Sequence, residues 1–246
     1  MKSIRKYMVI VAGCALFFGA CEKLNDNHQK FMKDGEIVYI GRVDSMRVLP
    51  GEERVVFRYW LADPRARSLT ATWSNGKESL MIEIPPHQPI DSFEVQIGKN
   101  EKTLTEGDYT FHWVTRDDKG NKSVVFEQIA KVYGERYKRT LSDRIIVNTQ
   151  TAGNNVTVTW GTSISDQEVG VTVKYTTQAG ETKILHYTTE DLTGETVEGL
   201  TGPIIELVST VMTNVNLSVP PQYLTKFLPV PLAVDTFYTD FRNILP

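Results

Sequence analysis

The sequence predicts an all-β protein in which two tandem β-sandwiches follow an N-terminal export signal. Three observations support this prediction. Runs of β-branched and aromatic residues recur about every 8–12 residues from Glu36 onward, with turn residues between them. No segment sustains a helical period of apolar residues over several turns. The first 21 residues pass from basic to apolar and end at a cysteine, which is typical of exported proteins.

Residues 1–20 have the composition of a lipoprotein signal peptide. Basic residues at the start precede the uncharged stretch 7–20. This stretch is shorter than the roughly 20 residues that a membrane-spanning helix needs. Small residues at its end directly precede Cys21, and the segment resembles the lipobox that a bacterial lipoprotein signal peptidase recognises. We therefore expect cleavage after Ala20 and lipidation of Cys21.

Cys14 is the competing lipidation residue. The residues before it are closer to an ordinary lipobox, but cleavage there would leave only about six apolar residues as the hydrophobic region. Cys21 is therefore the favoured anchor, with lipidation of Cys14 and plain secretion as the alternatives. These two cysteines are the only ones in the chain, so no disulfide forms further along it. Residues 21–36 then form the lipidated N-terminus and a polar tether.

Residues 37–134 are expected to form the first β-sandwich. Alternation places every second residue from Val55 to Leu61 on one face, which is the pattern of a half-buried strand. An Asn-Gly pair at 75–76 predicts a hairpin turn. The expected strands occupy residues 43–51, 53–61, 68–73, 77–84, 92–98, 104–115 and 123–134.

The stretch from Leu104 to Phe111 resembles the tyrosine corner of fibronectin type III and related immunoglobulin-like domains. Leu104, Gly107, Tyr109 and Phe111 stand at the spacing of that motif, at the start of a sixth strand. The resemblance implies that the hydroxyl of Tyr109 donates a hydrogen bond to the backbone nearby. It also implies the fold of such domains, two packed antiparallel sheets.

Residues 135–246 are expected to form a second sandwich of the same type. Alternation in 155–161 places two valines and a tryptophan on one face. Residues 202–221 match no strand pattern. The remaining expected elements are a hairpin at 169–188, a turn-rich segment at 193–202, and final strands within 227–241 that Pro229 and Pro231 interrupt.

The chain carries none of the common catalytic motifs. Its adjacent carboxylate pairs fall in strands or turns, where neighbouring side chains point in different directions. We therefore expect no enzyme activity and no cofactor. Asp117, Asp118 and Asn121 have oxygen atoms suited to Ca²⁺, but a turn favours these residue types anyway, so no metal is expected. The net charge of −3 gives no reason to expect nucleic acid as a partner.

Exposed aromatic side chains are the candidate ligand contacts, because their faces stack on sugar rings. Trp73, Trp113 and Trp160 share faces with apolar residues and are expected in the two cores. Trp60 instead shares a strand face with Arg58. Three interpretations are open for Trp60: ligand contact, packing against the second domain or the tether, and ordinary partial burial.

Two further aromatic residues, Tyr133 and Tyr137, stand where the first predicted sandwich gives way to the second. Ligands often bind at the junction between domains, so both are candidate ligand contacts. Packing between the domains is the favoured interpretation of these side chains.

Several phrases of the sequence resemble one family of bacterial lipoproteins. These phrases are KDGEIVYIGRVDS (33–45), ERVVFRYWLADP (53–64), DDKGNKSV (117–124), KVYGERY (131–137) and FLPVPLAVDTFYTDF (227–241). They are similar to the Bacteroidetes lipoprotein family with the domain of unknown function 4998. The resemblance covers most of residues 21–199 and 223–246, and its most specific phrase is DTFYTDF. It implies sandwich-like domains behind a lipid anchor and no established catalytic residues.

These observations lead us to expect a non-catalytic lipoprotein, anchored in the outer membrane through Cys21 and facing the cell surface. An accessory role in glycan binding or in an uptake complex is the first hypothesis, with Trp60, Tyr133 and Tyr137 as ligand contacts. An adhesin-like or structural spacer protein that binds another protein is the alternative. The expected partners are membrane lipid and either a polysaccharide or an outer-membrane protein.

Overall fold

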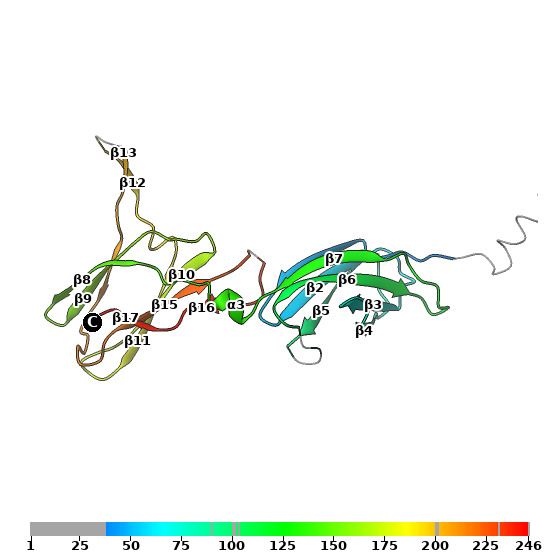
Figure 1. Ribbon diagram of the computed structural model, residues 1–246, viewed down its shortest axis with the longest axis horizontal. Helices are drawn as coiled ribbons and strands as arrows, with labels where there is room; N and C mark the ends of the chain where they lie inside the picture. The colour runs from blue at the N-terminus through cyan, green and yellow to red at the C-terminus, as the bar shows by residue number, and fades with distance from the viewer. Residues whose placement is uncertain are drawn as a thin grey trace, which may run out of the picture.

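The computed structural model describes residues 38–89, 91–99, 102, 104–199, 202–230 and 232–245, with the backbone alone for 196–199 and 202–205. These residues form two β-sandwiches that lie end to end, with the short helix α3 (Glu135–Lys138) between them (Figure 1). Each sandwich packs a three-stranded sheet against a larger one. The prediction of an all-β fold is confirmed.

The first sandwich contains seven strands that pair antiparallel within two sheets. One sheet has the order β1-β2-β5, and the other has the order β4-β3-β6-β7. The strands are β1 (Ser45–Pro50), β2 (Arg54–Leu61), β3 (Ser68–Trp73), β4 (Glu78–Glu83), β5 (Asp91–Gly98), β6 (Gly107–Arg116) and β7 (Phe126–Val132). This arrangement is the fibronectin type III-like sandwich that the sequence predicts.

The core of the first sandwich is built on aromatic rings. Every second residue of β2 from Val55 to Leu61 is buried, as the alternation predicts. The ring of Phe57 meets Phe111 and Trp113 edge-on, with centroids 4.8 and 4.9 Å apart. Ring pairs in this geometry stabilise by about 0.5–1.5 kcal/mol beyond the area they bury. The two sheets are therefore joined by specific ring contacts as well as by burial.

Local motifs hold the first sandwich in the expected way. The hydroxyl of Tyr109 donates to the backbone oxygen of Thr105 at 3.0 Å, so the tyrosine corner is confirmed. Asn75 and Gly76 have φ of 57° and 78°, which is the left-handed backbone that an Asn-Gly hairpin turn requires. The turn therefore connects β3 directly to β4, its partner in register.

The second sandwich repeats the arrangement with one insertion. Strands β14, β9 and β8 form one sheet; β11, β10 and β15 form the other, and β16 and β17 both pair with β15. The strands are β8 (Ile146–Ala152), β9 (Asn155–Trp160), β10 (Glu168–Thr176), β11 (Thr182–Thr188), β12 (Thr196–Gly199), β13 (Gly202–Ile205), β14 (Ser209–Met212), β15 (Gln222–Phe227), β16 (Phe237–Tyr238) and β17 (Arg242–Asn243). Among the described strands, β12 and β13 pair only with each other, and this β12–β13 ribbon projects away from the sandwich (Figure 1).

Two segments of the second sandwich differ from what the sequence pattern indicates. Residues 202–221 contain β13 and β14, although they match no strand pattern in the sequence. Both strands are four residues long, which is too short for alternation to be recognised. The last long strand is Gln222–Phe227, and the segment 227–241 is mostly the connection that follows it. Pro229 lies in this connection and interrupts no strand.

The tryptophans expected in the cores are buried there. Trp73 and Trp113 lie in the first core, and Trp160 lies in the second. The Trp160 ring packs edge-on against Tyr223 at 5.5 Å between centroids, and its Nε1 donates to Thr210 at 2.8 Å. The aromatic periodicity therefore identifies core positions correctly in both sandwiches.

The second core also holds a buried ion pair. The side chains of Arg144 and Glu168 are 1% and 0% exposed, and Nη1 lies 2.6 Å from Oε1. Arg144 also donates to the backbone oxygens of Gly161 and Leu192, and Ser163 donates to the second oxygen of Glu168. Both charged groups thus have hydrogen-bond partners, which burial of an ion pair requires.

Candidate functional site

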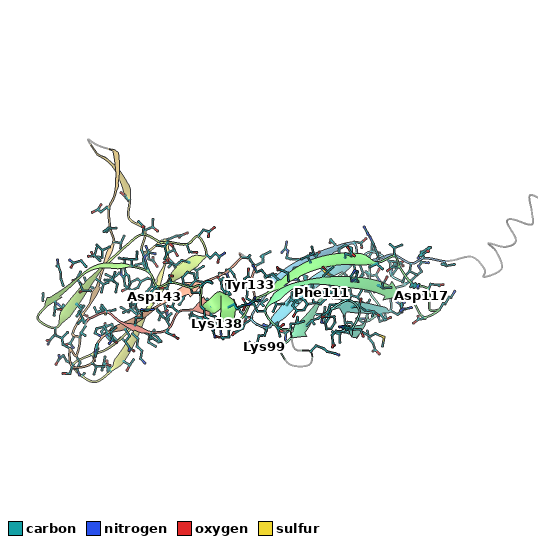
Figure 2. The ribbon with its side chains drawn as sticks, in the orientation of Figure 1. Lys99, Phe111, Asp117, Tyr133, Lys138 and Asp143 are labelled. Atoms are coloured by element: carbon teal, nitrogen blue, oxygen red, sulfur yellow. The ribbon has the colours of Figure 1, made fainter. Side chains whose placement is uncertain are left out.

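The junction of the two sandwiches gathers aromatic side chains from both of them. Tyr133 follows β7, Tyr137 lies on α3, and Phe237 lies on β16. The ring centroids are 4.7 Å apart for Tyr133–Tyr137, 5.0 Å for Tyr137–Phe237 and 5.8 Å for Tyr133–Phe237. Figure 2 shows Tyr133 where the two sandwiches meet. Residues distant in the sequence therefore form one apolar contact between the domains.

Burial at the junction favours the neutral form of both tyrosines. It raises the pKa of Tyr137 to about 12 and also raises the pKa of Tyr133. The hydroxyl of Tyr137 donates to Oε1 of Gln167 in the second sandwich at 2.9 Å. Both rings lie in the contact between the domains, as the packing interpretation predicts. Their role as ligand contacts stays a prediction.

A charged clamp lies beside these rings. Arg54, at the start of β2, donates from Nε at 2.9 Å and from Nη2 at 2.6 Å to the two carboxylate oxygens of Asp235. The backbone N–H of Glu52 donates to the same carboxylate at 2.8 Å. Burial disfavours the ionised form of Asp235, but these hydrogen bonds outweigh it and lower its pKa below the ordinary value. The two-pronged Arg–Asp contact sets distance and direction between the domains.

Backbone contacts bring the two chain segments close together at the clamp. The N–H of Val234 donates to the carbonyl oxygen of Pro50 at 2.8 Å. A Cβ atom on Gly51 would meet the side chains of both Asp235 and Val234. Glycine is therefore needed at this position for the connection between β15 and β16 to reach the first sandwich.

The linker helix is held by carboxylates of the first sandwich. Glu106, just before β6, accepts from the backbone N–H groups of Arg136 at 2.7 Å and Tyr137 at 2.9 Å. Lys138 forms an ion pair with Glu52, and this contact raises the pKa of the lysine. The start of α3 is thus fixed to one sandwich, while Tyr137 contacts the other.

The sequence predicts the aromatic residues of this junction but not its charged pair. Tyr133 and Tyr137 are recognised because they stand in the linker. The pattern around Arg54 indicates only a strand. Asp235 lies about 180 positions further along the chain, so no local pattern links the two residues. The signal that points to Asp235 is the phrase DTFYTDF, which begins with that residue and contains Phe237. This phrase supplies both the clamp carboxylate and an aromatic ring of the junction.

Trp60 lies on a different surface of the first sandwich. It faces outward from β2 and is partly exposed, next to Ser45 on β1 and Ser92 on β5. Asp44, Ser45, Met46 and Arg47 line an open hollow around it. Arg54 is six residues earlier on the same strand, so Trp60 lies about 20 Å from the junction. Packing of Trp60 against the second domain is therefore ruled out. Contact of its ring with a ligand stays a prediction, and the alternative contact with the tether involves residues outside the described ranges.

The carboxylate oxygens of Asp117 accept hydrogen bonds from within their own turn. Oδ1 of Asp117 accepts from the backbone N–H groups of Lys119 and Asn121, and Oδ2 accepts from the Asn121 amide. These contacts lower the pKa of Asp117. In the part of the chain that the structure describes, no group of three or more acidic, histidine or cysteine side chains is placed to hold a metal.

The predicted anchor residue Cys21 lies outside the described residues. Within the described ranges, no helix is long and apolar enough to cross a membrane. The absence of an enzyme site and of nucleic acid binding stays an expectation from the sequence.

Three solved structures resemble the chain at low sequence identity. A two-domain fibronectin type III segment of chicken tenascin is 13% identical, with a TM-score of 0.29, over 82% of this chain and 99% of that segment. The FN1–FN3 domains of chicken CNTN1 are 9% identical, with a TM-score of 0.39, over 85% of this chain and 65% of that one. Dimeric latent PorU from Porphyromonas gingivalis is 12% identical, with a TM-score of 0.27, over 84% of this chain and 20% of PorU.

No curated protein matches the sequence. One family does match it, over residues 21–237, and this match contains the junction, the clamp and Trp60. The chain therefore belongs to the DUF4998 family, which is described as a domain of unknown function.

Proposed function

We propose that this chain is a non-catalytic, lipid-anchored protein of the outer cell surface that holds glycan as an accessory component of an uptake system. The hollow around Trp60 is the observation that supports the proposal most directly. It offers a partly exposed aromatic face beside Arg47 and Asp44, which have a donor and an acceptor for sugar hydroxyl groups. Binding sites for small ligands combine such an apolar surface with a few polar groups.

The junction between the sandwiches supports this proposal because it fixes their relative orientation. The Arg54–Asp235 clamp, the aromatic contact and the fixed start of α3 hold the two sandwiches in one orientation. The first described residue, Val38, lines a surface near Asp117, which lies at the end of the first sandwich away from the junction (Figure 2). A tether from Cys21 would enter at that end. The second sandwich then projects outward from the membrane.

The anchor is tested by localisation. The family match begins at residue 21, where we expect the mature chain to begin. Cys21→Ala should abolish labelling by a fatty-acid analogue and release the protein from the membrane fraction. Cys14→Ala is the matched control and should change neither readout. Labelling that persists in Cys21→Ala and is lost in Cys14→Ala would overturn the assignment.

The ligand is tested on a glycan array with the fragment 22–246. We expect binding to at least one polysaccharide, and Trp60→Ala should weaken it about tenfold, the usual effect of losing a central aromatic contact. Tyr39→Ala removes another exposed aromatic ring of the first sandwich and serves as the control. Equal binding by all three proteins would show that Trp60 is not the contact.

A protein partner is the second candidate function, and the β12–β13 ribbon favours it. A two-stranded ribbon has unpaired backbone groups along both edges, where a strand of another protein can add. Pull-down from a solubilised cell envelope should then recover a partner with the full fragment and not with a fragment whose residues 196–205 are replaced by a short Gly-Asn turn. Recovery that is unchanged by this replacement, or that depends on added sugar, would contradict the ribbon's role.

A further inference from the structure

The outer face of the larger sheet in the second sandwich presents lysines together with aromatic rings. Along β10, residues Val171, Val173 and Tyr175 point into the core. The alternate positions therefore face outward. We define the cationic sheet face by the residues Ile184, Lys174, His186, Lys226, Tyr238 and Phe241, which lie on β10, β11, β15, β16 and the loop before β17.

The strand register places these side chains on one surface. Lys174 pairs with Ile184 on one side and with Gln222 on the other. Lys226, four residues after Gln222 on β15, pairs with Tyr238. Four residues of extended strand span about 13 Å. A single extended molecule lying along β15 would therefore pass both lysines.

Two aromatic rings are exposed on this face. Tyr238 is 51% exposed and Phe241 is 45% exposed, whereas their neighbour Phe237 is buried in the junction. The ammonium group of Lys174 lies 5.8 Å from the centre of the Phe241 ring. Aromatic residues are enriched where proteins bind partners, and a cation is attracted to the face of an aromatic ring.

The face is positively charged. Nζ of Lys226 lies 3.3 Å from Nδ1 of His186, which also contacts the hydroxyl of Thr172 at 3.0 Å. Neither lysine forms an ion pair with a described residue. The outward positions of the four strands hold no carboxylate among the described side chains. The acidic residues near them are Glu181, Asp191 and Asp240 in the adjoining turns and loops, and Asp191 accepts from the hydroxyl of Thr188 at 2.8 Å. The cations are therefore available to an anionic ligand.

We propose that the cationic sheet face binds a linear acidic polysaccharide, a polymer that carries uronate carboxylates. The rings of Tyr238 and Phe241 stack on sugar faces, while Lys174 and Lys226 pair with carboxylates by charge-assisted hydrogen bonds. The face is a flat sheet surface, which suits an extended chain laid across it. Gln222, which pairs with Lys174 across β10 and β15, provides a neutral partner for sugar hydroxyl groups beside the cation.

This inference rests on the proposed function and adds to it a second glycan-binding surface with a stated class of ligand. The test measures binding of the fragment 22–246 to polygalacturonate, to neutral dextran and to poly-glutamate at low and high salt. We expect polygalacturonate to bind most tightly and to bind less tightly as salt rises. The Lys174→Gln/Lys226→Gln variant should lose tenfold or more, and Tyr238→Ala about fivefold. All substituted side chains are exposed or half-exposed, so the melting temperature should stay unchanged.

The control is Lys77→Gln/Lys119→Gln, which removes two exposed lysines from turns of the first sandwich and should bind as the parent does. Poly-glutamate bound as tightly as polygalacturonate would overturn the glycan assignment in favour of an acidic peptide. Binding of polygalacturonate that survives the paired lysine substitution would overturn the site. If dextran binds through Trp60 and polygalacturonate does not bind, this inference alone is overturned. If no glycan binds, the proposed function is overturned as well.

Discussion

The two sandwiches share a strand order and differ in what holds their cores. The first core is joined by rings, with Phe57 in contact with Phe111 and Trp113 from the facing sheet. The second core contains the buried pair of Arg144 and Glu168 in addition to its apolar residues. One fold can therefore be stabilised by many similar contacts or can depend on one polar centre.

The buried pair of Arg144 and Glu168 contacts several parts of the second sandwich. Arg144 precedes β8, Glu168 begins β10, and Leu192, whose carbonyl oxygen accepts from Arg144, stands at the base of the β12–β13 ribbon. The hydroxyl of Tyr223 on β15 donates to the backbone oxygen of Arg144 at 3.1 Å. Loss of one charge would therefore affect the connections between several strands at once.

Glu168→Ala gives the largest expected effect. It leaves Arg144 charged, buried and without its partner, which costs about 3–5 kcal/mol of the free energy of unfolding. Hydrogen exchange of the backbone amides over a range of urea concentrations, followed strand by strand, measures the loss in each sandwich separately. The control is Glu94→Ala on the exposed pair with Arg58, which should cost about 1 kcal/mol or less. Similar costs for the two variants would contradict the special role of the buried pair.

Phe57→Ala is the matching test of the first core, with a comparable expected cost of about 3–5 kcal/mol. The cavity it leaves lies among Phe111 and Trp113, so the first sandwich should unfold at lower urea concentration. The second sandwich, followed by hydrogen exchange of the amides of β9 and β10 over the same urea range, should keep its own midpoint. A shift of both transitions by the same amount would show that the two sandwiches unfold as one unit.

Asp235→Asn tests the junction between the two sandwiches. It weakens the contact with Arg54. We expect the docked arrangement of the two sandwiches to lose about 1–3 kcal/mol of stability, the range for hydrogen bonds to charged groups. Small-angle scattering should show a broader distribution of overall dimensions. Glu94→Ala is again the control and should leave the scattering curve unchanged. A curve for Asp235→Asn that overlays the parent's would contradict the clamp.

The same junction should respond to acid. The pKa of Asp235 is lower in the folded protein than in the unfolded chain, so ionisation stabilises the folded state. This contribution is fully present above the ordinary pKa of an aspartate and is lost as pH falls through the lowered value. Scattering of the parent should therefore broaden only in strong acid, and the Asp235→Asn variant should show no such step.

Tyr109→Phe is the smallest of these effects. It removes the hydrogen bond to the backbone of Thr105 and keeps the ring, which should cost about 1 kcal/mol. The urea midpoint of the first sandwich measures it. An unchanged midpoint would mean that the tyrosine corner of this domain is maintained by ring packing alone.

The sequence predictions are also more accurate for the first sandwich than for the second. In the first sandwich, alternation along β2 and the turn at Asn75 predict the structure directly, because long strands and tight turns are local features. In the second, β14 has only four residues and shows no pattern. Its place is set by pairing with β9, and such long-range pairing cannot be read from a short window.

Periodicity and short motifs along the chain are enough to predict the fold class, the core tryptophans and the tyrosine corner, because these features are encoded locally. The contact of Asp235 with Arg54, the pairing of Arg144 with Glu168 inside a core, and the open face that two lysines share with Tyr238 are visible only in the folded molecule. These contacts join residues far apart in the chain. Their partners depend on how the sheets pack, which is a property of the folded molecule as a whole.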